Sequence, residues 1–317
     1  METIAVVTRD CAGVNAALRS VVRTATSHKM KVQGVIKGYD GLIDGRFLPL
    51  SRQSVSGILY QGGTILKTAR SKRFLTCEGQ NSAVKTIQDH AIDGVIVIGG
   101  NGSLTGAHVL ATITDVPVIG IPATIDNDIT GVDHTIGSDT AVNVALDALD
   151  KIRDTATSLE RIFVLEVMGR DCGYIALQVA LAGGCEEVLI PEMPMNLNTT
   201  CEEILKSYEI GKESWIVIVV EGQAKAHDVA QVITEKTGLE TRVAVLGHIQ
   251  RGGRPTAKDR ILASRLGNHA VEVLRKGLTD HCVTIHNDEL CTIRLEEAIQ
   301  RKTIDPTAFY ALIKLLT

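Results

Sequence analysis

The chain has 317 residues, of which 44% are hydrophobic but only 3% aromatic, so its core is expected to be built from aliphatic side chains. Its 33 basic and 37 acidic residues give a formal charge of −4, which argues against nucleic acid or a membrane surface as a partner. No apolar run reaches the about 18 residues of a membrane span, and no signal-peptide pattern opens the chain, so a cytoplasmic protein is expected. The seven cysteines show no zinc or redox spacing and are expected to be reduced thiols.

Strand-like and helix-like segments alternate in the first half of the chain. Strands are predicted at residues 4–8, 32–36, 95–98 and 116–121, and helices at 14–27 and 82–91. An alternation of this kind predicts a parallel sheet with helices on both faces.

The alternation resumes further along the chain and predicts a second α/β unit. Strands are predicted at residues 162–166, 188–190, 215–220 and 242–246, and helices at 142–154, 172–182, 202–211 and 226–236. A helix over 136–153 is the expected connector between the two units.

The most informative segment runs from residue 93 to residue 128. A buried strand breaks at Gly99 and Gly100, where backbone N–H groups can face an anion, and a helix starting near Ser103 would add its positive end. A second strand is followed by Asp126 and Asp128, at the strand ends where open α/β sheets bind ligands. The segment therefore predicts phosphoryl chemistry.

Two observations complicate this interpretation. Thr124 followed by two acids could simply cap a helix, and by itself that simpler interpretation would be preferred. Asn101 supplies no negative charge where a phosphoryl-transfer site would use a carboxylate to hold Mg²⁺. Other motifs favour a catalytic site over a helix cap, because they also lie at the ends of strands.

The chain resembles the bacterial-type 6-phosphofructokinases over nearly its full length. The segments that carry the resemblance, in order, are GGNGS, PATIDND, TIGSDTA, LEVMGRDCG, AGGCEEVLIPE and VLGHIQRGGRPTAKDRILASRLG. The resemblance implies an α/β fold of two Rossmann-like three-layer domains with mainly parallel sheets. It places residues 1–137 plus 252–304 in the larger, nucleotide-binding domain and 138–251 plus 305–317 in the smaller, sugar-phosphate domain. It also implies a homotetramer with shared sites.

The resemblance assigns catalytic roles to four residues. Asp126 matches the base that takes the proton from the 1-hydroxyl of fructose 6-phosphate, and Asp128 the acid that helps to position metal and substrate. Thr124 matches the hydroxyl that contacts the transferred phosphoryl group. Arg170 matches a cation that stabilises charge on the equatorial oxygens in the transition state.

Further residues match the family's binding site for the sugar phosphate. Besides Thr124, Asp126 and Arg170, they are Met168, Gly169, Glu221, His248 and Arg251, with Arg161 and Arg242 reaching in from a neighbouring subunit. Surface ion pairing is the alternative for each arginine.

A second anion site also matches the family, namely its effector pocket for a nucleoside diphosphate such as ADP or for phosphoenolpyruvate. The matching residues are Arg19, Arg23, Arg52, Arg153, Glu186 and Lys212. Arginines suit a phosphate or carboxylate effector. The alternative is a solvated basic face on the first helix, although like charges four residues apart destabilise a helix slightly.

The donor side departs from the family pattern. Residues that match ATP contacts are Tyr39, Arg70, Gly102, Ser103 and Gly106. The first loop, residues 9–13, is two residues shorter than the family's Ser-Gly-Gly-Asp-Ala-Pro-Gly and lacks its diglycine, so the side chains of Asp10 and Cys11 are expected to crowd the γ-phosphate.

Two further positions on the donor side also differ. Asn101 stands where the family has the aspartate that holds Mg²⁺, so the metal ligand is lost and Mg²⁺, the cofactor that the family implies, is expected to bind weakly. Ala123 stands where ATP users have glycine. The pyrophosphate-dependent branch is not matched either, because Ala123 and Gly102 depart from its pattern.

Three hypotheses follow. The chain is a working phosphofructokinase with a rearranged loop, another donor or slower turnover. Alternatively, it is a weak or silent paralogue that binds sugar phosphate and effector and regulates an active phosphofructokinase chain in a hetero-oligomer. A sugar-phosphate sensor is the third. Fructose 6-phosphate binding and impaired ATP turnover are expected.

Overall fold

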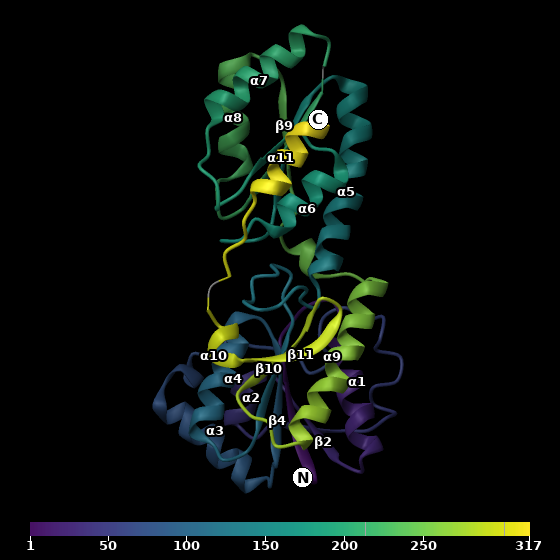
Figure 1. Ribbon diagram of the computed structural model, residues 1–317, viewed down its shortest axis with the longest axis vertical. Coiled ribbons are helices and arrows are strands. Elements are labelled where there is room, and N and C mark those ends of the chain that lie inside the picture. The colour runs from purple at the N-terminus through teal and green to yellow at the C-terminus, as the bar shows by residue number, and fades with distance from the viewer. Residues whose placement is uncertain (213, 301) are drawn as a thin grey trace. The chain divides into compact units, whose positions relative to one another are not determined.

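The computed structural model describes residues 1–212, 214–300 and 302–317. Contacts within the chain divide it into two compact units (Figure 1). Unit 1 consists of Met1–Thr140 with Arg251–Lys302, and unit 2 of Ala141–Gln250 with Thr303–Thr317. No helix of the described residues combines the length and the apolar character that crossing a membrane requires.

Unit 1 contains a seven-stranded sheet in the order β11-β10-β5-β4-β1-β2-β3. The inner five strands are parallel, and the two edge strands are antiparallel to their neighbours. The strands are β1 Thr3–Thr8, β2 Lys31–Val35, β3 Phe47–Leu50, β4 Gly94–Gly99, β5 Val118–Pro122, β10 His281–His286 and β11 Glu289–Arg294.

The strand order of unit 1 places a topological switch point between β1 and β4. The strand that follows β1 in the chain, β2, lies on one side of it, whereas the strand that follows β4, β5, lies on the other side. The carboxyl ends of β1 and β4 therefore border the crevice in which open α/β sheets bind ligands.

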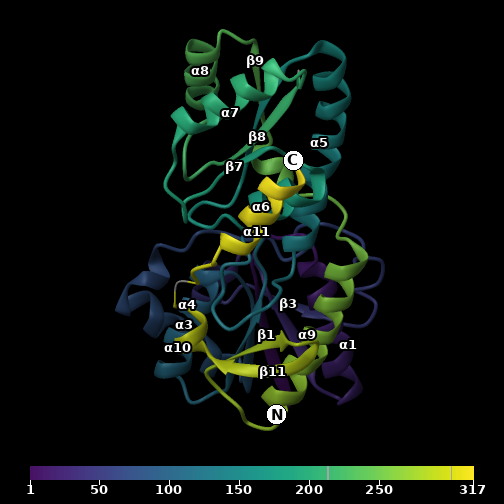
Figure 2. The same cartoon turned by 45° about the horizontal axis from the view of Figure 1, so that its top comes forward.

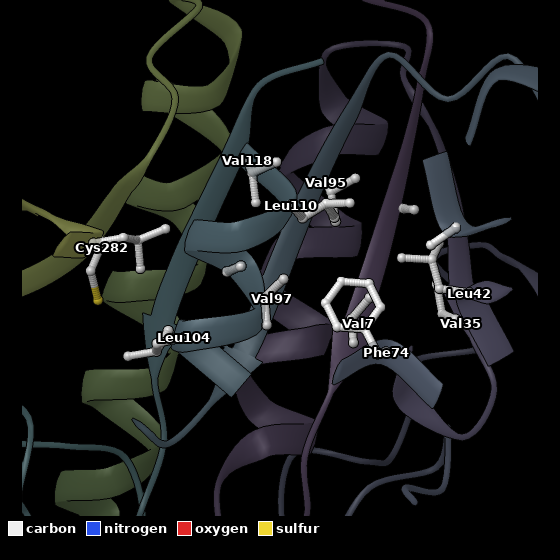
Figure 3. Close-up of a cluster of buried hydrophobic side chains, with 14 of the residues drawn as sticks. Val7, Val35, Leu42, Phe74, Val95, Val97, Leu104, Leu110, Val118 and Cys282 are labelled. Carbon is white, nitrogen blue, oxygen red and sulfur yellow. The ribbon is translucent and has the colours of Figure 1, made fainter. Parts of the chain in front are cut away.

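Helices cover both faces of this sheet. α1 (Val14–Ser27) packs with α9 (Ala257–Arg275) on one face, and α3 (Cys77–Asp89), α4 (Asn101–Ile113) and α10 (Leu295–Ala298) lie on the other (Figure 2). The short α2 (Gly38–Ile43) and η1 (Arg73–Leu75) lie beside α3. Figure 3 shows the aliphatic core between the sheet and α4, in which Val95, Val97, Leu104 and Leu110 are fully buried.

Unit 2 is a smaller α/β unit with a four-stranded parallel sheet in the order β7-β8-β6-β9. Its strands are β6 Ile162–Val167, β7 Glu187–Leu189, β8 Trp215–Val220 and β9 Thr241–Val245. Its helices are α5 Ser138–Leu159, whose first turn belongs to unit 1, α6 Tyr174–Gly183, α7 Leu197–Glu209, α8 Ala226–Thr237 and α11 Thr307–Leu316, and η2 spans Gly247–Arg251.

An ion-pair cluster around the buried Glu187 holds the C-terminal helix α11 on unit 2. Lys314 Nζ donates to Glu187 Oε2 at 2.9 Å and to Glu203 Oε2 at 2.7 Å. The Tyr310 hydroxyl donates to Glu187 Oε1 at 3.1 Å, and Glu187 is almost completely buried. The cluster ties α11 to β7 and α7.

The predicted fold class, mainly parallel α/β sheets, is confirmed, and each of the eight predicted strands is present. The predicted starts of two helices were wrong. α3 begins at Cys77 because Thr76 caps it by accepting a hydrogen bond from Gly79 N, and α7 begins at Leu197 because Asn196 caps it in the same way. α6 begins at Tyr174, two residues later than predicted, and strands β3, β10 and β11 were not predicted.

Candidate active site

The glycine turn and Thr124 meet at the carboxyl edge of the unit 1 sheet. Gly99 pairs with Pro122 across β4 and β5, and Ala123 N donates to the Gly99 carbonyl at 3.0 Å. A β-carbon placed on Gly100 would lie 3.1 Å from Thr124 Cβ, so a larger residue would press on Thr124. The two ends of the 93–128 segment thus form one site.

The loop after β5 presents Asp126 in a fixed position. Asn127, at a φ of +50°, donates from Nδ2 to the Asp133 carbonyl at 3.0 Å and accepts from Thr135 N at 2.8 Å. Thr135 Oγ1 donates to the Thr124 carbonyl at 2.7 Å, and Asp126 N donates to Thr124 Oγ1 at 3.3 Å. Asp126 itself is only 7% exposed. The segment begins no helix, so the alternative of a simple helix cap is wrong.

Asn101 forms a hydrogen bond with Asp128. Asn101 Nδ2 donates to Asp128 Oδ2 at 2.6 Å, and its own Oδ1 is buried without a hydrogen bond from any described residue. Two carboxylates in these places would repel each other unless a cation lay between them, whereas the amide pairs with the acid directly. The described residues contain no group of three or more acids, histidines or cysteines arranged to hold a metal. The pair therefore carries one negative charge where two carboxylates would carry two, and so attracts Mg²⁺ less strongly.

The short loop after β1 is packed into unit 1. Arg9 N donates to the Ile98 carbonyl at 2.9 Å, which continues the pairing of β1 with β4. The Cys11 thiol is buried and donates to the Ile136 carbonyl at 3.3 Å, and burial raises the pKa of this thiol far above its usual value. Arg251 donates to the Asp10 carbonyl at 3.3 Å. The bulk of Cys11 is thus accommodated inside the unit.

Tyr39 fixes the first turns of α4. Its hydroxyl donates to the Ser103 carbonyl at 2.7 Å, and its ring stacks on Phe74 at 4.2 Å between centroids. The ring also fills the space above Gly106, where a β-carbon would come within 2.7 Å of it, and burial raises the pKa of Tyr39. In contrast, Gly102 and Arg70 are exposed, and a β-carbon on Gly102 would have no neighbour within 4 Å.

Unit 2 holds five of the ten expected sugar-phosphate residues at the carboxyl ends of β6, β8 and β9. Met168 and Gly169 follow β6, and Glu221 N donates to the Val167 carbonyl at 2.9 Å. Arg170 is exposed at a φ of +53°, and His248 is exposed on η2.

A residue that was not predicted supports this group. Gln250 is completely buried, and its Oε1 accepts a hydrogen bond from Met168 N at 2.8 Å. The signal was available, because Gln250 lies inside the motif that contains His248 and Arg251.

Arg161 and Arg242 lie at the opposite, amino-terminal edge of the same sheet. Arg161 directly precedes β6, and Arg242 is the second residue of β9. Arg161 Nε donates to Glu240 Oε2 at 2.8 Å, and Arg242 forms an ion pair with Glu240 Oε1. Within unit 2, therefore, these two arginines are not brought together with Met168 and Arg170. Both form the surface ion pairs considered as the alternative.

The expected effector residues form one group in each unit. In unit 2, Arg153 donates to the carbonyls of Gly183 and Gly184, and Glu186 accepts from Ile216 N at 2.8 Å and pairs with Lys212 at 3.1 Å.

In unit 1, the pKa of Arg19 is lowered by burial and by the nearby charges of Arg23 and Arg52. Arg23 Nε is buried and forms no hydrogen bond with a described residue. Three guanidinium groups therefore gather on this unit.

A glycine turn and a buried acid at the carboxyl edge of a mainly parallel sheet are typical of α/β proteins that bind phosphorylated ligands. Comparison with known proteins narrows this class. Residues 3–274 match the Phosphofructokinase family, and the chain belongs to that family.

Two curated relatives match all or nearly all of the chain. The ATP-dependent 6-phosphofructokinase of Thermotoga petrophila is 48% identical over 308 residues, covering 96% of this chain and 97% of the relative. The enzyme of the same name from Clostridium tetani is 46% identical over 319 residues, covering 100% of both.

Solved phosphofructokinases share the fold. The structure of the Pichia pastoris enzyme in the T-state matches with a TM-score of 0.90 at 34% identity, over 94% of this chain and 37% of the Pichia chain. This chain thus spans little more than a third of that protein. The pyrophosphate-dependent enzyme of Marinobacter aquaeolei matches with a TM-score of 0.85 at 24% identity, over 97% and 86%, and at that identity shows the fold alone.

Proposed function

We propose that this protein is a cytoplasmic 6-phosphofructokinase of glycolysis, which transfers a phosphoryl group to the 1-hydroxyl of fructose 6-phosphate and forms fructose 1,6-bisphosphate. The observation that carries the proposal is the buried carboxylate of Asp126, held by a braced loop directly beside the glycine turn of β4. The names of the curated relatives support the same reaction.

In this reaction, Asp126 accepts the proton of the 1-hydroxyl as the oxygen attacks the γ-phosphorus of the donor. The bond from that phosphorus to the β–γ bridging oxygen breaks, and the nucleoside diphosphate leaves. The hydroxyl of Thr124 contacts the transferred group, and the guanidinium of Arg170 stabilises the charge that accumulates on its oxygens. Met168, Gly169, Glu221, His248 and Arg251 bind the sugar phosphate, with Arg161 and Arg242 contributed by a second subunit of a homotetramer. The amino-edge position of those two arginines supports that assignment.

The donor is an adenine nucleotide bound by Tyr39, Arg70, Gly102, Ser103 and Gly106, and its turnover is impaired. Asn101 supplies no carboxylate for Mg²⁺, and its amide nitrogen is bonded to the carboxylate of Asp128. The loop after β1 has no glycine pair through which backbone amides could approach the γ-phosphate.

The Asn101–Asp128 hydrogen bond also favours a second function. With this bond in its donor site, the chain would bind sugar phosphate and effector. An active phosphofructokinase chain in the same hetero-oligomer would then perform the phosphoryl transfer. The effector, ADP or phosphoenolpyruvate, would bind Arg19, Arg23, Arg52, Arg153, Glu186 and Lys212. The basic groups found in each unit support an anionic effector.

A coupled assay tests the proposal. Formation of fructose 1,6-bisphosphate is followed with ATP, GTP or pyrophosphate and Mg²⁺, for the protein alone and mixed with a second phosphofructokinase chain, alongside calorimetry with fructose 6-phosphate. Slow turnover with ATP is expected. No turnover with any donor, together with rescue by Asn101→Asp in a chain with the diglycine loop restored, would refute a working enzyme, and altered activity of the second phosphofructokinase chain in the mixture would support the regulatory function. Absence of fructose 6-phosphate binding would refute both.

A further inference from the structure

The switch-point crevice of unit 1 is bordered by the residues that directly follow β1 and β4. On the β1 side this residue is Arg9, and on the β4 side the turn of Gly100 and Asn101 begins α4. A ligand bound in the crevice would therefore lie between Arg9 on one side and the start of α4 on the other.

Arg9 is built closely against the glycine turn. A β-carbon on Gly99 would lie 3.0 Å from Arg9 Cβ, and the backbone of Arg9 is held by its hydrogen bond to the Ile98 carbonyl. At its far end, Nη1 of Arg9 donates to the Ala69 carbonyl at 3.4 Å. The next residue, Arg70, is exposed, so two arginines are joined to one short segment beside the turn.

The charge at this edge suits a polyphosphate without a divalent metal. A nucleoside triphosphate needs positive charge near its β- and γ-phosphates, which enzymes supply with Mg²⁺ on carboxylates or with basic side chains. Asn101 is neutral and its amide nitrogen is bonded to Asp128, so this position adds no negative charge that would attract a metal ion. Arginine, by contrast, offers several N–H donors in a fixed arrangement that matches phosphate oxygens.

We infer that Arg9 binds the phosphates of the donor nucleotide together with Arg70, and that nucleotide binding by this protein does not require Mg²⁺. This inference rests on the proposed function, which places the donor at this edge. The inference concerns nucleotide binding and not the phosphoryl-transfer step.

Calorimetry with a non-hydrolysable ATP analogue, AMP-PNP, tests the inference on the full chain. The titration is made in EDTA and in Mg²⁺ for the parent protein and for Arg9→Ser, Arg9→Lys and Asn101→Asp. Arg46→Ser is the matched control, because Arg46 is an exposed arginine of the same unit paired with Asp44. Arg19→Ser tests whether the analogue binds instead at the effector arginines of unit 1, which are Arg19, Arg23 and Arg52. Fructose 6-phosphate is titrated into every variant to verify a folded sugar site.

The parent is expected to bind AMP-PNP in EDTA with an affinity within about threefold of that in Mg²⁺. Arg9→Ser should weaken binding in EDTA about tenfold or more, because a charge-assisted hydrogen bond is lost, while Arg9→Lys should retain part of it. Asn101→Asp should make binding depend on Mg²⁺. The Arg46→Ser variant should bind as the parent does.

Binding by the parent in Mg²⁺ only would overturn the inference and leave the proposed function standing. Equal loss in Arg19→Ser would also overturn it, by placing the analogue in the effector group. Loss of fructose 6-phosphate binding by the parent would refute the proposed function itself.

Discussion

The sulfur of Cys11 occupies the space that a side chain on Gly137 would need. A β-carbon on Gly137 would come within 2.0 Å of Cys11 Sγ, and Gly137 has a φ of +100°, which strains any other residue. Because Gly137 directly precedes α5, this contact fixes the loop after β1 to the start of that helix. The loop that departs from the family pattern is thus locked in place.

Gly137→Ala is therefore expected to lower the free energy of unfolding by about 2–3 kcal/mol, through overpacking and backbone strain together. Gly277→Ala is the matched control, because its φ is +79° but no atom lies within 4 Å of a β-carbon there, so it reports the strain alone. Urea unfolding measures both. Cys11→Ala should recover part of the loss in the double variant, and equal effects of the two glycine substitutions would show that the sulfur does not matter.

Asn101→Asp is expected to destabilise unit 1 in the absence of a divalent cation. It replaces a charge-assisted hydrogen bond with two facing carboxylates, a loss of about 2 kcal/mol. Thermal unfolding in EDTA should show a lower Tm than the parent, and Mg²⁺ should raise it again.

The swapped pair, Asn101→Asp with Asp128→Asn, is the control for that prediction, since it restores one amide and one carboxylate. It should unfold near the parent temperature in EDTA. A single Asn101→Asp variant as stable as the parent in EDTA would mean that the hydrogen bond contributes nothing.

The success of the predictions for strands β4 and β8 has a physical cause. β4 and β8 are buried on both faces, and their sequences are continuous apolar runs. β3 and β11 are edge strands with largely exposed side chains, and a strand that buries little surface leaves no such pattern.

The site was predictable in part for a similar reason. Motifs locate the residues that follow strands, and parallel strands bring those residues to one edge. The bond between Asn101 and Asp128, and the support that Gln250 gives to Met168, depend on side-chain directions across distant segments, which no local pattern encodes.

Asp126→Asn is expected to lower kcat about 100- to 10,000-fold while leaving the Kd for fructose 6-phosphate nearly unchanged, because it removes the base but keeps the shape. Single-turnover kinetics and calorimetry measure the two quantities. Asp115→Asn, which changes an exposed acid of the same unit, should alter neither. A variant at Asp126 with parental kcat would exclude this carboxylate as the base.

Lys314→Met should lower the free energy of unfolding by about 2–4 kcal/mol, because it leaves Glu187 buried without its cation. The control is Lys151→Met, which breaks an exposed pair with Asp147 and should cost less than about 0.5 kcal/mol. Denaturant unfolding followed by the fluorescence of Trp215 in unit 2 measures both. Equal costs would show that burial of the pair is irrelevant.

The same cluster predicts a pH dependence at high pH. Burial opposes the shift, but hydrogen bonds to Glu203 and Glu187 raise the pKa of Lys314 above its usual value. Its contribution is therefore complete below the unfolded pKa of about 10.4 and is lost as the pH rises through the raised value. The difference in stability between parent and Lys314→Met should shrink as the pH is raised above about 10.4, and a difference that grows there would contradict the assignment.

Glu240 neutralises Arg161 and Arg242 from within their own unit. Any anion that binds these arginines must compete with Glu240, which belongs to the same chain and is therefore always present beside them. A weakly basic monoanion gains little from such an exchange, whereas a phosphate ester, which carries about two charges near pH 7, gains more from the same guanidinium groups than Glu240 does. Competition with Glu240 therefore favours doubly charged anions over singly charged ones as ligands of these two arginines.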